Sequence, residues 1–118
     1  MILMKKIDAS GGNTTYGKEY FYQIETSLTT PSTSDSILVA PFLQIAVGFF
    51  PVSLDGKGYV EYTCDTIDRV NAGTAEWLKW ADGDVLDVRF NEVQSCVALR
   101  LVSLIGSVRM VVTTCEKV

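Results

Sequence analysis

The acidic side chains are the first candidates for chemistry, because some of them are spaced as in an oxygen-ligand site. Asp82, Asp84 and Asp87 in DGDVLD resemble a fragment of a calcium-binding loop, and Asp65 and Asp68 could add oxygen ligands. A calcium loop also needs a later glycine and a terminal bidentate glutamate, and DGDVLD lacks both at loop spacing. The sequence therefore favours an Asp-Gly turn solvated by the other aspartates, and predicts no metal site.

The other catalytic residue types give little support to an enzyme. The chain has no histidine, which excludes Ser-His-Asp and Cys-His catalysis and histidine-ligated metals. Cys64, Cys96 and Cys115 have no CxxC spacing and no neighbouring base, so they predict buried reduced thiols. Two glycosidase carboxylates could be present among the fourteen acidic residues, but a domain of this size has little room for a substrate cleft. We expect no enzymatic activity and no cofactor.

The charge and hydropathy patterns disfavour two classes of partner. Ten basic and fourteen acidic residues give a net charge of -4, and the basic residues are scattered, so nucleic-acid binding is disfavoured. The longest apolar run, 37–52, is interrupted by Pro41, Gln44, Gly48 and Pro51 and is shorter than the roughly 20 residues of a membrane-spanning helix, so it is expected to form core. The lysines of MILMKKIDAS follow the apolar residues, which is the wrong order for an export signal. We expect neither nucleic acid nor membrane as a partner.

The tryptophans are the side chains best suited to binding. Trp77 and Trp80 lie three residues apart in GTAEWLKWADGDV, so a helix would place them on one face and a strand on opposite faces. About eight residues separate Gly73 from Asp82-Gly83, which is short for an uncapped helix. We expect a strand that ends at Asp-Gly, with one tryptophan in the core and the other on an outer face.

An outward tryptophan has two possible uses. It could stack on a sugar, with Tyr59 or Tyr62 as a second aromatic side chain. Burial against another chain is the favoured alternative, since Trp, Tyr and Arg are enriched at protein interfaces. The expected interface residues are two tryptophans, two tyrosines and two strand arginines: Trp77, Trp80, Tyr59, Tyr62, Arg100 and Arg109.

Period-two alternation predicts strands through most of the chain. YVEYTCD (59–65) and VLDVRF (85–90) alternate as half-buried strands do, and KEYFYQIETSL (18–28) is rich in Tyr and Phe. No segment has helical periodicity over three turns. The polar stretch TTPSTSDS (29–36) is expected to form a loop with no driving force to pack.

Two glycine turns predict β-hairpins. The runs 97–104 and 107–115 are rich in β-branched residues and surround Gly106, and Asp55-Gly56 gives a second hairpin signal. Both faces of the C-terminal pair carry apolar residues, as in central strands or in a pair that meets another subunit.

Together these elements predict one all-β domain. About seven to eight short strands separated by turns are typical of a β-sandwich, a jelly roll or a small barrel. Residues 1–17, which contain SGGNTTYG, are expected to form a flexible N-terminal arm or an extended segment, and residues 18–118 the sandwich.

One part of the sequence resembles a known class of proteins. GKGYVEYTCDTIDRVNAGTAEWLKWADGDV, followed after a gap by VALRLVSLIGSVRMVV, resembles small virion proteins of tailed bacteriophages over roughly residues 56–112. The resemblance implies a β-sandwich or jelly roll that acts through subunit contacts, and it contains no catalytic residues. Residues 1–55 are not covered, so it does not assign a capsid-attachment segment.

The resemblance implies a structural role on the capsid surface. The chain is expected to be a decoration (cement) protein that binds the major capsid protein and forms a homo-oligomer, with a trimer favoured. Its expected location is the capsid surface of the virion, which is assembled in the host cytoplasm. A tail or neck component and a carbohydrate-binding β-sandwich are the alternatives.

Overall fold

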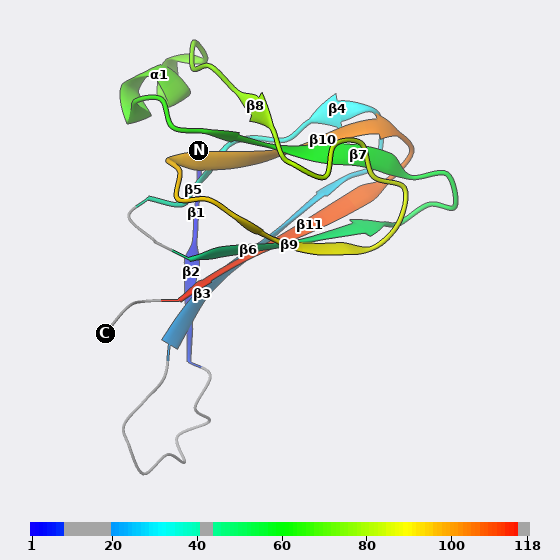
Figure 1. Cartoon of the computed structure of the whole chain (residues 1–118), viewed down its shortest axis with the longest axis horizontal. Coiled ribbons are helices and arrows are strands. Elements are labelled where there is room, and N and C mark those ends of the chain that lie inside the picture. Colours follow the sequence, from blue (N-terminus) through cyan, green and yellow to red (C-terminus); the bar gives the residue numbers. More distant parts are fainter. Residues whose placement is uncertain (9–19, 41–43, 116–118) are drawn as a thin grey trace.

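The alternating segments fold as two facing β-sheets. A computed structural model describes residues 1–8, 20–40 and 44–115, and within them it contains eleven strands and one short helix (Figure 1). The elements are β1 (Ile2–Leu3), β2 (Lys5–Asp8), β3 (Tyr20–Leu28), β4 (Ser32–Thr33), β5 (Ile37–Leu38), β6 (Ile45–Pro51), β7 (Lys57–Thr63), α1 (Ile67–Ala72), β8 (Leu78–Lys79), β9 (Arg89–Val93), β10 (Ala98–Ile105) and β11 (Val108–Cys115). The all-β prediction is confirmed. The strand number is higher than expected because β1, β4, β5 and β8 have two residues each.

The two sheets are built by a chain that repeatedly changes sheet. Within the described residues, the six-stranded sheet has the order β1-β5-β10-β7-β8, with β4 also paired to β10, and the five-stranded sheet has the order β2-β3-β11-β6-β9. Figure 1 shows them as an upper and a lower layer. From β5 onward every connection except β7–β8 passes from one sheet to the other. This alternation is the connectivity of a jelly roll.

Both predicted β-hairpins are wrong, although their strands are correct. β10 pairs with β7, β5 and β4, whereas β11 pairs with β3 and β6, so the turn at Gly106 joins the two sheets. The Asp55-Gly56 turn likewise joins β6 of one sheet to β7 of the other. A glycine turn permits a reversal of the chain but does not determine whether the flanking strands pair or face each other. The apolar residues on both faces of the C-terminal strands are explained by their central positions in the sheets.

The two sheet-crossing turns, at Asp55-Gly56 and at Gly106, lie side by side and are hydrogen-bonded to each other. The Ser107 backbone N–H donates to Ser53 Oγ at 2.9 Å, and the Val52 N–H donates to the Ser107 carbonyl at 2.8 Å. Gly106 has φ +65°, the left-handed region that favours glycine. A Cβ at Gly106 would collide with Ser53 Oγ and lie 2.7 Å from Asp55 Oδ1. The turn therefore requires glycine for both its conformation and its space.

The core lies between the inner faces of the two sheets. The central strands supply its largest fully buried side chains, and the segment 37–52 contributes several, as predicted for a core segment. Among the buried residues are Ile37, Val47, Phe49, Val60, Leu99, Leu101, Met110 and Val112. Among the described residues, no helix is long and apolar enough to cross a bilayer.

Three other predictions need correction. Residues 1–8 are an extended segment, the second of the two alternatives, and not a flexible arm, because β1 pairs with β5 and β2 pairs with β3; the rest of the predicted arm lies outside the described residues. The loop 29–36 contains β4, which pairs with β10. VLDVRF is not a half-buried strand: Val85 is buried, but residues 86–90 are exposed and β9 begins only at Arg89.

The tryptophan segment follows a helix that the periodicity did not reveal. α1 begins after Thr66, whose hydroxyl accepts from the Arg69 N–H, and ends at Gly73, which has φ 75°. Six residues are too few to show a helical repeat. The strand predicted at the tryptophans is the two-residue β8, with Trp77 before it and Trp80 after it. As predicted, they separate: Trp80 is buried and Trp77 is half-buried on the outer side of the six-stranded sheet.

Candidate functional site

A groove crosses the outer face of the five-stranded sheet. It has a volume of about 730 Å³, and its lining comes from β3, β6, β9 and β11. Phe50, Phe90, Val111, Ala46 and Gly48 form its apolar part. We call this feature the aromatic groove.

Two phenylalanines and an arginine give the aromatic groove its shape. The Phe50 and Phe90 rings meet edge to face, with centroids 5.5 Å apart. They can meet over β6 because Gly48 has no side chain; a Cβ there would lie 2.9 Å from Phe50 Cε2. The Arg109 guanidinium lies 4.1 Å from the centre of the Phe50 ring and 3.6 Å from a Glu25 carboxylate oxygen. Phe90 is 74% exposed, which is unusual for a large aromatic residue.

Polar groups border the aromatic groove on both sides. Gln23 Nε2 donates to Thr113 Oγ1 at 3.2 Å on one side. On the other side Asn91 Nδ2 donates to Asp82 Oδ1 at 2.7 Å, and Glu92 is exposed. The groove thus has an apolar centre and a polar rim, the arrangement found in protein interfaces.

The outer face of the six-stranded sheet has two cation–aromatic contacts of its own. The Arg100 guanidinium lies 4.2 Å from the centre of the Trp77 ring, while its Nε donates to Glu61 Oε1 at 2.9 Å. Lys79 Nζ lies 4.1 Å from the centre of the Tyr59 ring and donates to Asp84 Oδ1 at 2.8 Å. This hydrogen bond raises the pKa of Lys79 and lowers the pKa of Asp84. The cations of these contacts are therefore already balanced by carboxylates.

Beside Trp77 lies a second, more polar depression, which we call the Trp77 hollow. It has a volume of about 450 Å³ and lies between α1, the segment 34–36 and β10. Trp77, Arg100, Asn71, Ser34, Asp35 and Ser36 are among its lining residues.

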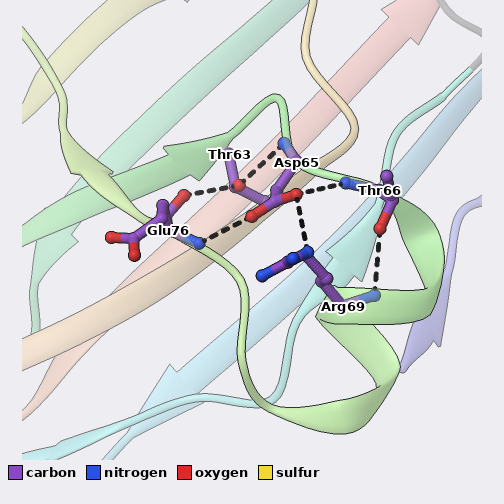
Figure 2. A network of polar contacts seen from close by, with 5 residues as sticks. All are labelled: Thr63, Asp65, Thr66, Arg69 and Glu76. Atoms are coloured by element: carbon purple, nitrogen blue, oxygen red, sulfur yellow. Dashed lines mark hydrogen bonds and ion pairs between the residues drawn. The ribbon is translucent and has the colours of Figure 1, made fainter.

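A polar network fixes the segment that carries Trp77 (Figure 2). Asp65 Oδ1 accepts from the Thr66 N–H at 2.8 Å and Oδ2 accepts from the Glu76 N–H at 3.1 Å, so one carboxylate ties together the two ends of the α1 segment. Thr63 Oγ1 donates to the Glu76 carbonyl at 2.6 Å, and Arg69 Nε lies 3.8 Å from Asp65 Oδ1. The two backbone N–H donors are the main reason that the pKa of Asp65 is lowered. Because Glu76 directly precedes Trp77, the network positions the indole.

The six predicted interface residues do not form one surface. Arg109 borders the aromatic groove, whereas Tyr59, Trp77 and Arg100 lie on the outer face of the opposite sheet. The other two face inward: Tyr62 packs partly against the core, and Trp80 is 4% exposed. The Trp80 ring lies 6.3 Å from that of Phe49, and its Nε1 donates to the Gly83 carbonyl at 2.8 Å.

The sequence interpretation missed the two phenylalanines of the aromatic groove. Phe50 belongs to the apolar run that was expected to be core, and Phe90 was grouped with Leu86 and Val88 on one face of a strand. In the structure Leu86, Val88 and Phe90 are 67%, 52% and 74% exposed. The alternation was visible, but nothing in it distinguished an outward apolar face from an inward one.

The aspartates of DGDVLD are used within the fold. Asp82 accepts from Asn91, Asp84 from Lys79 and Asp87 from Arg89. Gly83 has φ +65° and its N–H donates to the Trp80 carbonyl, so the predicted turn is confirmed. Among the described residues, no group of three or more His, Cys, Asp and Glu side chains is arranged to hold a metal ion.

The cysteines differ in exposure. Cys96 is buried as expected, and burial raises its pKa to about 12. Cys64 is exposed, so the prediction of a buried thiol is wrong for this residue; it follows the end of β7, where the alternation no longer describes the backbone. The side chain of Cys115 lies outside the described part of the chain.

Comparison with solved structures shows a shared fold. No protein-family model matches the sequence, and the comparison with curated proteins gives no match. Oxalate oxidase superposes with a TM-score of 0.55 and 12% identity over 96% of this chain and 50% of that chain. The cysteine peptidase Peruvianin-I from Thevetia peruviana latex superposes with a TM-score of 0.51 and 9% identity, over 81% of this chain and 50% of that chain. The chain thus spans half the length of each, and at these identities the likeness shows the fold alone.

A smaller similarity concerns a prophage protein. The SPBc2 prophage-derived protein YomS is 11% identical over 80% of this chain and 95% of that chain, with a TM-score of 0.49. A likeness of this size carries no argument about function.

Proposed function

We propose that this chain is a structural protein of a tailed-bacteriophage virion, and more specifically a decoration protein that stabilises the head by bridging capsid subunits. The aromatic groove is the observation that carries the proposal. The outer face of a sandwich sheet is ordinarily polar, because it contacts water. Here that face presents Phe90, Phe50 and Val111. We infer that a protein partner covers it.

The composition of the aromatic groove supports a protein partner. Aromatic residues and arginine are enriched at interfaces, and binding energy concentrates in a few such side chains surrounded by a polar rim. Phe50, Phe90 and Arg109 form such a group, and the Glu25 carboxylate keeps Arg109 in place over the Phe50 ring.

The sequence resemblance supports the finer assignment. The segment 56–112, which resembles small tailed-phage virion proteins, contains β7, α1, β8, β9 and β10 and most of β11. Of the four strands that line the aromatic groove, β9 and β11 fall in this segment, while β3 and β6 do not. The resemblance therefore supports the class of protein, and the groove supports the mode of attachment.

The energetics suit a protein that acts in many copies. Complete burial of a phenylalanine side chain contributes about 1.5–3 kcal/mol, so one groove supplies modest affinity. A copy that touches two capsid subunits gains effective concentration for its second contact. We further propose that copies associate as a trimer, since cyclic symmetry closes repeated contacts. Light scattering after size-exclusion chromatography would then give three times the 13.0 kDa mass of one chain.

The test is a cryo-EM reconstruction of the phage particle that contains the chain. We expect density for the chain at symmetry-related positions on the head, with the five-stranded sheet facing the major capsid protein. Density only at a tail, neck or unique vertex would make the chain an accessory component of another part of the virion. Contact with the shell through the six-stranded sheet would contradict the role of the aromatic groove.

A further inference from the structure

We propose that the Trp77 hollow is a binding site for a neutral sugar ring. This site lies on the six-stranded sheet, opposite the aromatic groove, so it does not depend on how the chain attaches to a partner. Its volume of about 450 Å³ falls in the range of ligand pockets, about 300–1,000 Å³.

The hollow combines an aromatic side chain with a fixed planar cation. Trp77 is half-buried and the Arg100 guanidinium lies 4.2 Å from its ring centre, so each restricts the movement of the other. Glu61 accepts from Arg100 Nε at 2.9 Å. A guanidinium has four further N–H donors on its Nη atoms, which sugar hydroxyl oxygens can engage.

The opposite wall supplies both acceptors and donors. Asn71 on α1 is exposed and carries an amide that both donates and accepts. The carboxylate of Asp35 is 61% exposed and is oriented by the Ser36 N–H, which donates to Oδ1 at 2.9 Å. Ser34 Oγ accepts from the Leu101 N–H at 2.9 Å, which joins this wall to β10. Because the Arg100 guanidinium covers one face of the Trp77 ring, the apolar C–H face of a sugar would contact the part of the half-buried indole that stays exposed, and its hydroxyls would bond to the polar groups around it.

The charges favour a neutral sugar over an acidic one. Arg100 is already paired with Glu61, and Asp35 is paired with the Met1 ammonium, which lies 3.1 Å from its Oδ2. An acidic sugar would bring a further negative charge without meeting an unneutralised cation. A neutral ring uses the same hydrogen-bonding groups without this repulsion.

The loop network makes the hollow rigid enough to bind. Asp65 and Thr63 hold Glu76 from one side of the α1 segment, and Thr66 caps the helix whose last turn lines the hollow. Trp77 therefore does not have to be ordered when a ligand binds, which reduces the entropic cost of binding.

The two tryptophans provide the experiment with an internal control. In a ¹H–¹⁵N NMR titration the Trp77 indole N–H reports on the hollow, while the Trp80 indole N–H is bonded to the Gly83 carbonyl in the core. Glucose, galactose, mannose and N-acetylglucosamine are added up to about 50 mM, far above the ~1 mM dissociation constant of a weak site. Glucuronic acid and N-acetylneuraminic acid are the acidic comparisons.

We expect at least one neutral sugar to shift the Trp77 indole signal in a saturable way and to leave the Trp80 signal in place. Asn71→Ala, an exposed substitution, should weaken binding about tenfold. Trp77→Phe, which lacks the reporting indole and is followed through the backbone N–H signal of Asn71, should weaken it, and Phe90→Ala should leave it unchanged. The proposal is overturned if no neutral sugar moves the Trp77 signal, if only acidic sugars do, or if the shifts cluster at the aromatic groove.

Discussion

Replacement of Gly106 by alanine tests whether the turn between β10 and β11 joins two sheets. Alanine at φ +65° lowers the free energy of unfolding by about 1–2 kcal/mol, because the left-handed conformation is unfavourable for it. Its Cβ would also displace Ser53 Oγ, which accepts from the Ser107 N–H, and one such hydrogen bond contributes about 0.5–1.5 kcal/mol. Together these effects predict a loss of about 1.5–3.5 kcal/mol.

Gly83→Ala is the matched control. Gly83 has the same φ of +65°, but nothing lies within 4 Å of the Cβ that alanine would add. It should therefore cost only the conformational part, about 1–2 kcal/mol. The loss of unfolding free energy in each variant would be measured by urea unfolding followed by circular dichroism. At about 4 °C per kcal/mol, the melting temperature should fall by about 6–14 °C for Gly106→Ala and about 4–8 °C for Gly83→Ala.

The comparison separates the two topologies. In a hairpin, Gly106 would lie at an exposed tip and its substitution would resemble that of Gly83. If Gly106→Ala destabilises the protein no more than Gly83→Ala does, the packing of the two sheet-crossing turns against each other is refuted.

Three further predictions follow from the loop network, the thiols and the tryptophans. The lowered pKa of Asp65 means that its stabilising contribution is present above the ordinary aspartate value of 3.8 and is lost as the pH falls through the lower folded value. The protection factors of the Thr66 and Glu76 amides, which correct for the intrinsic pH dependence of exchange, should therefore fall in acid in the wild type and already be low near neutral pH in Asp65→Asn; wild-type protection factors that do not change with pH would contradict this. In a Cys115→Ser background, Cys64 should react with a thiol reagent at once and Cys96 only on unfolding, because burial raises the pKa of Cys96 to about 12; two equally fast thiols would oppose the burial. Trp80→Phe should cost about 1–3 kcal/mol in urea unfolding, since it removes core volume and the bond to Gly83, and Trp77→Phe less than 1 kcal/mol; the reverse order would contradict their placement.

The strands could be predicted from the sequence because successive side chains of a strand point to opposite faces of the sheet, so apolar and polar residues alternate. The all-β class, the strands 97–104 and 107–115 and the separation of Trp77 from Trp80 all depend on this local rule. Pairing could not be predicted, because Gly106 and Asp55-Gly56 permit both a hairpin and a sheet crossing. The two are distinguished by long-range pairing, of β10 with β7 and of β11 with β3 and β6.

The candidate surfaces were harder to predict than the fold. Phe90 has the alternation of a core residue, and its exposure depends on the edge position of β9, which no local pattern encodes. The Trp77 hollow requires α1, whose six residues are identifiable only from the Thr66 cap and Gly73. Arg100 could be identified only as an interface candidate, because its pairing with Glu61 follows from the register of β7 and β10.

The central claim, that the aromatic groove attaches the chain to capsid subunits, is tested most directly by binding to heads that lack the chain. Phe90→Ala removes the most exposed ring of the groove, and Leu78→Ala, at a residue 60% exposed on β8 of the other sheet, is the control. Both should unfold at nearly the wild-type urea concentration, because both side chains are exposed. The number of copies bound per head, measured after sedimentation, should fall at least tenfold for Phe90→Ala and stay at the wild-type level for Leu78→Ala. Wild-type occupancy with Phe90→Ala would contradict the proposed attachment.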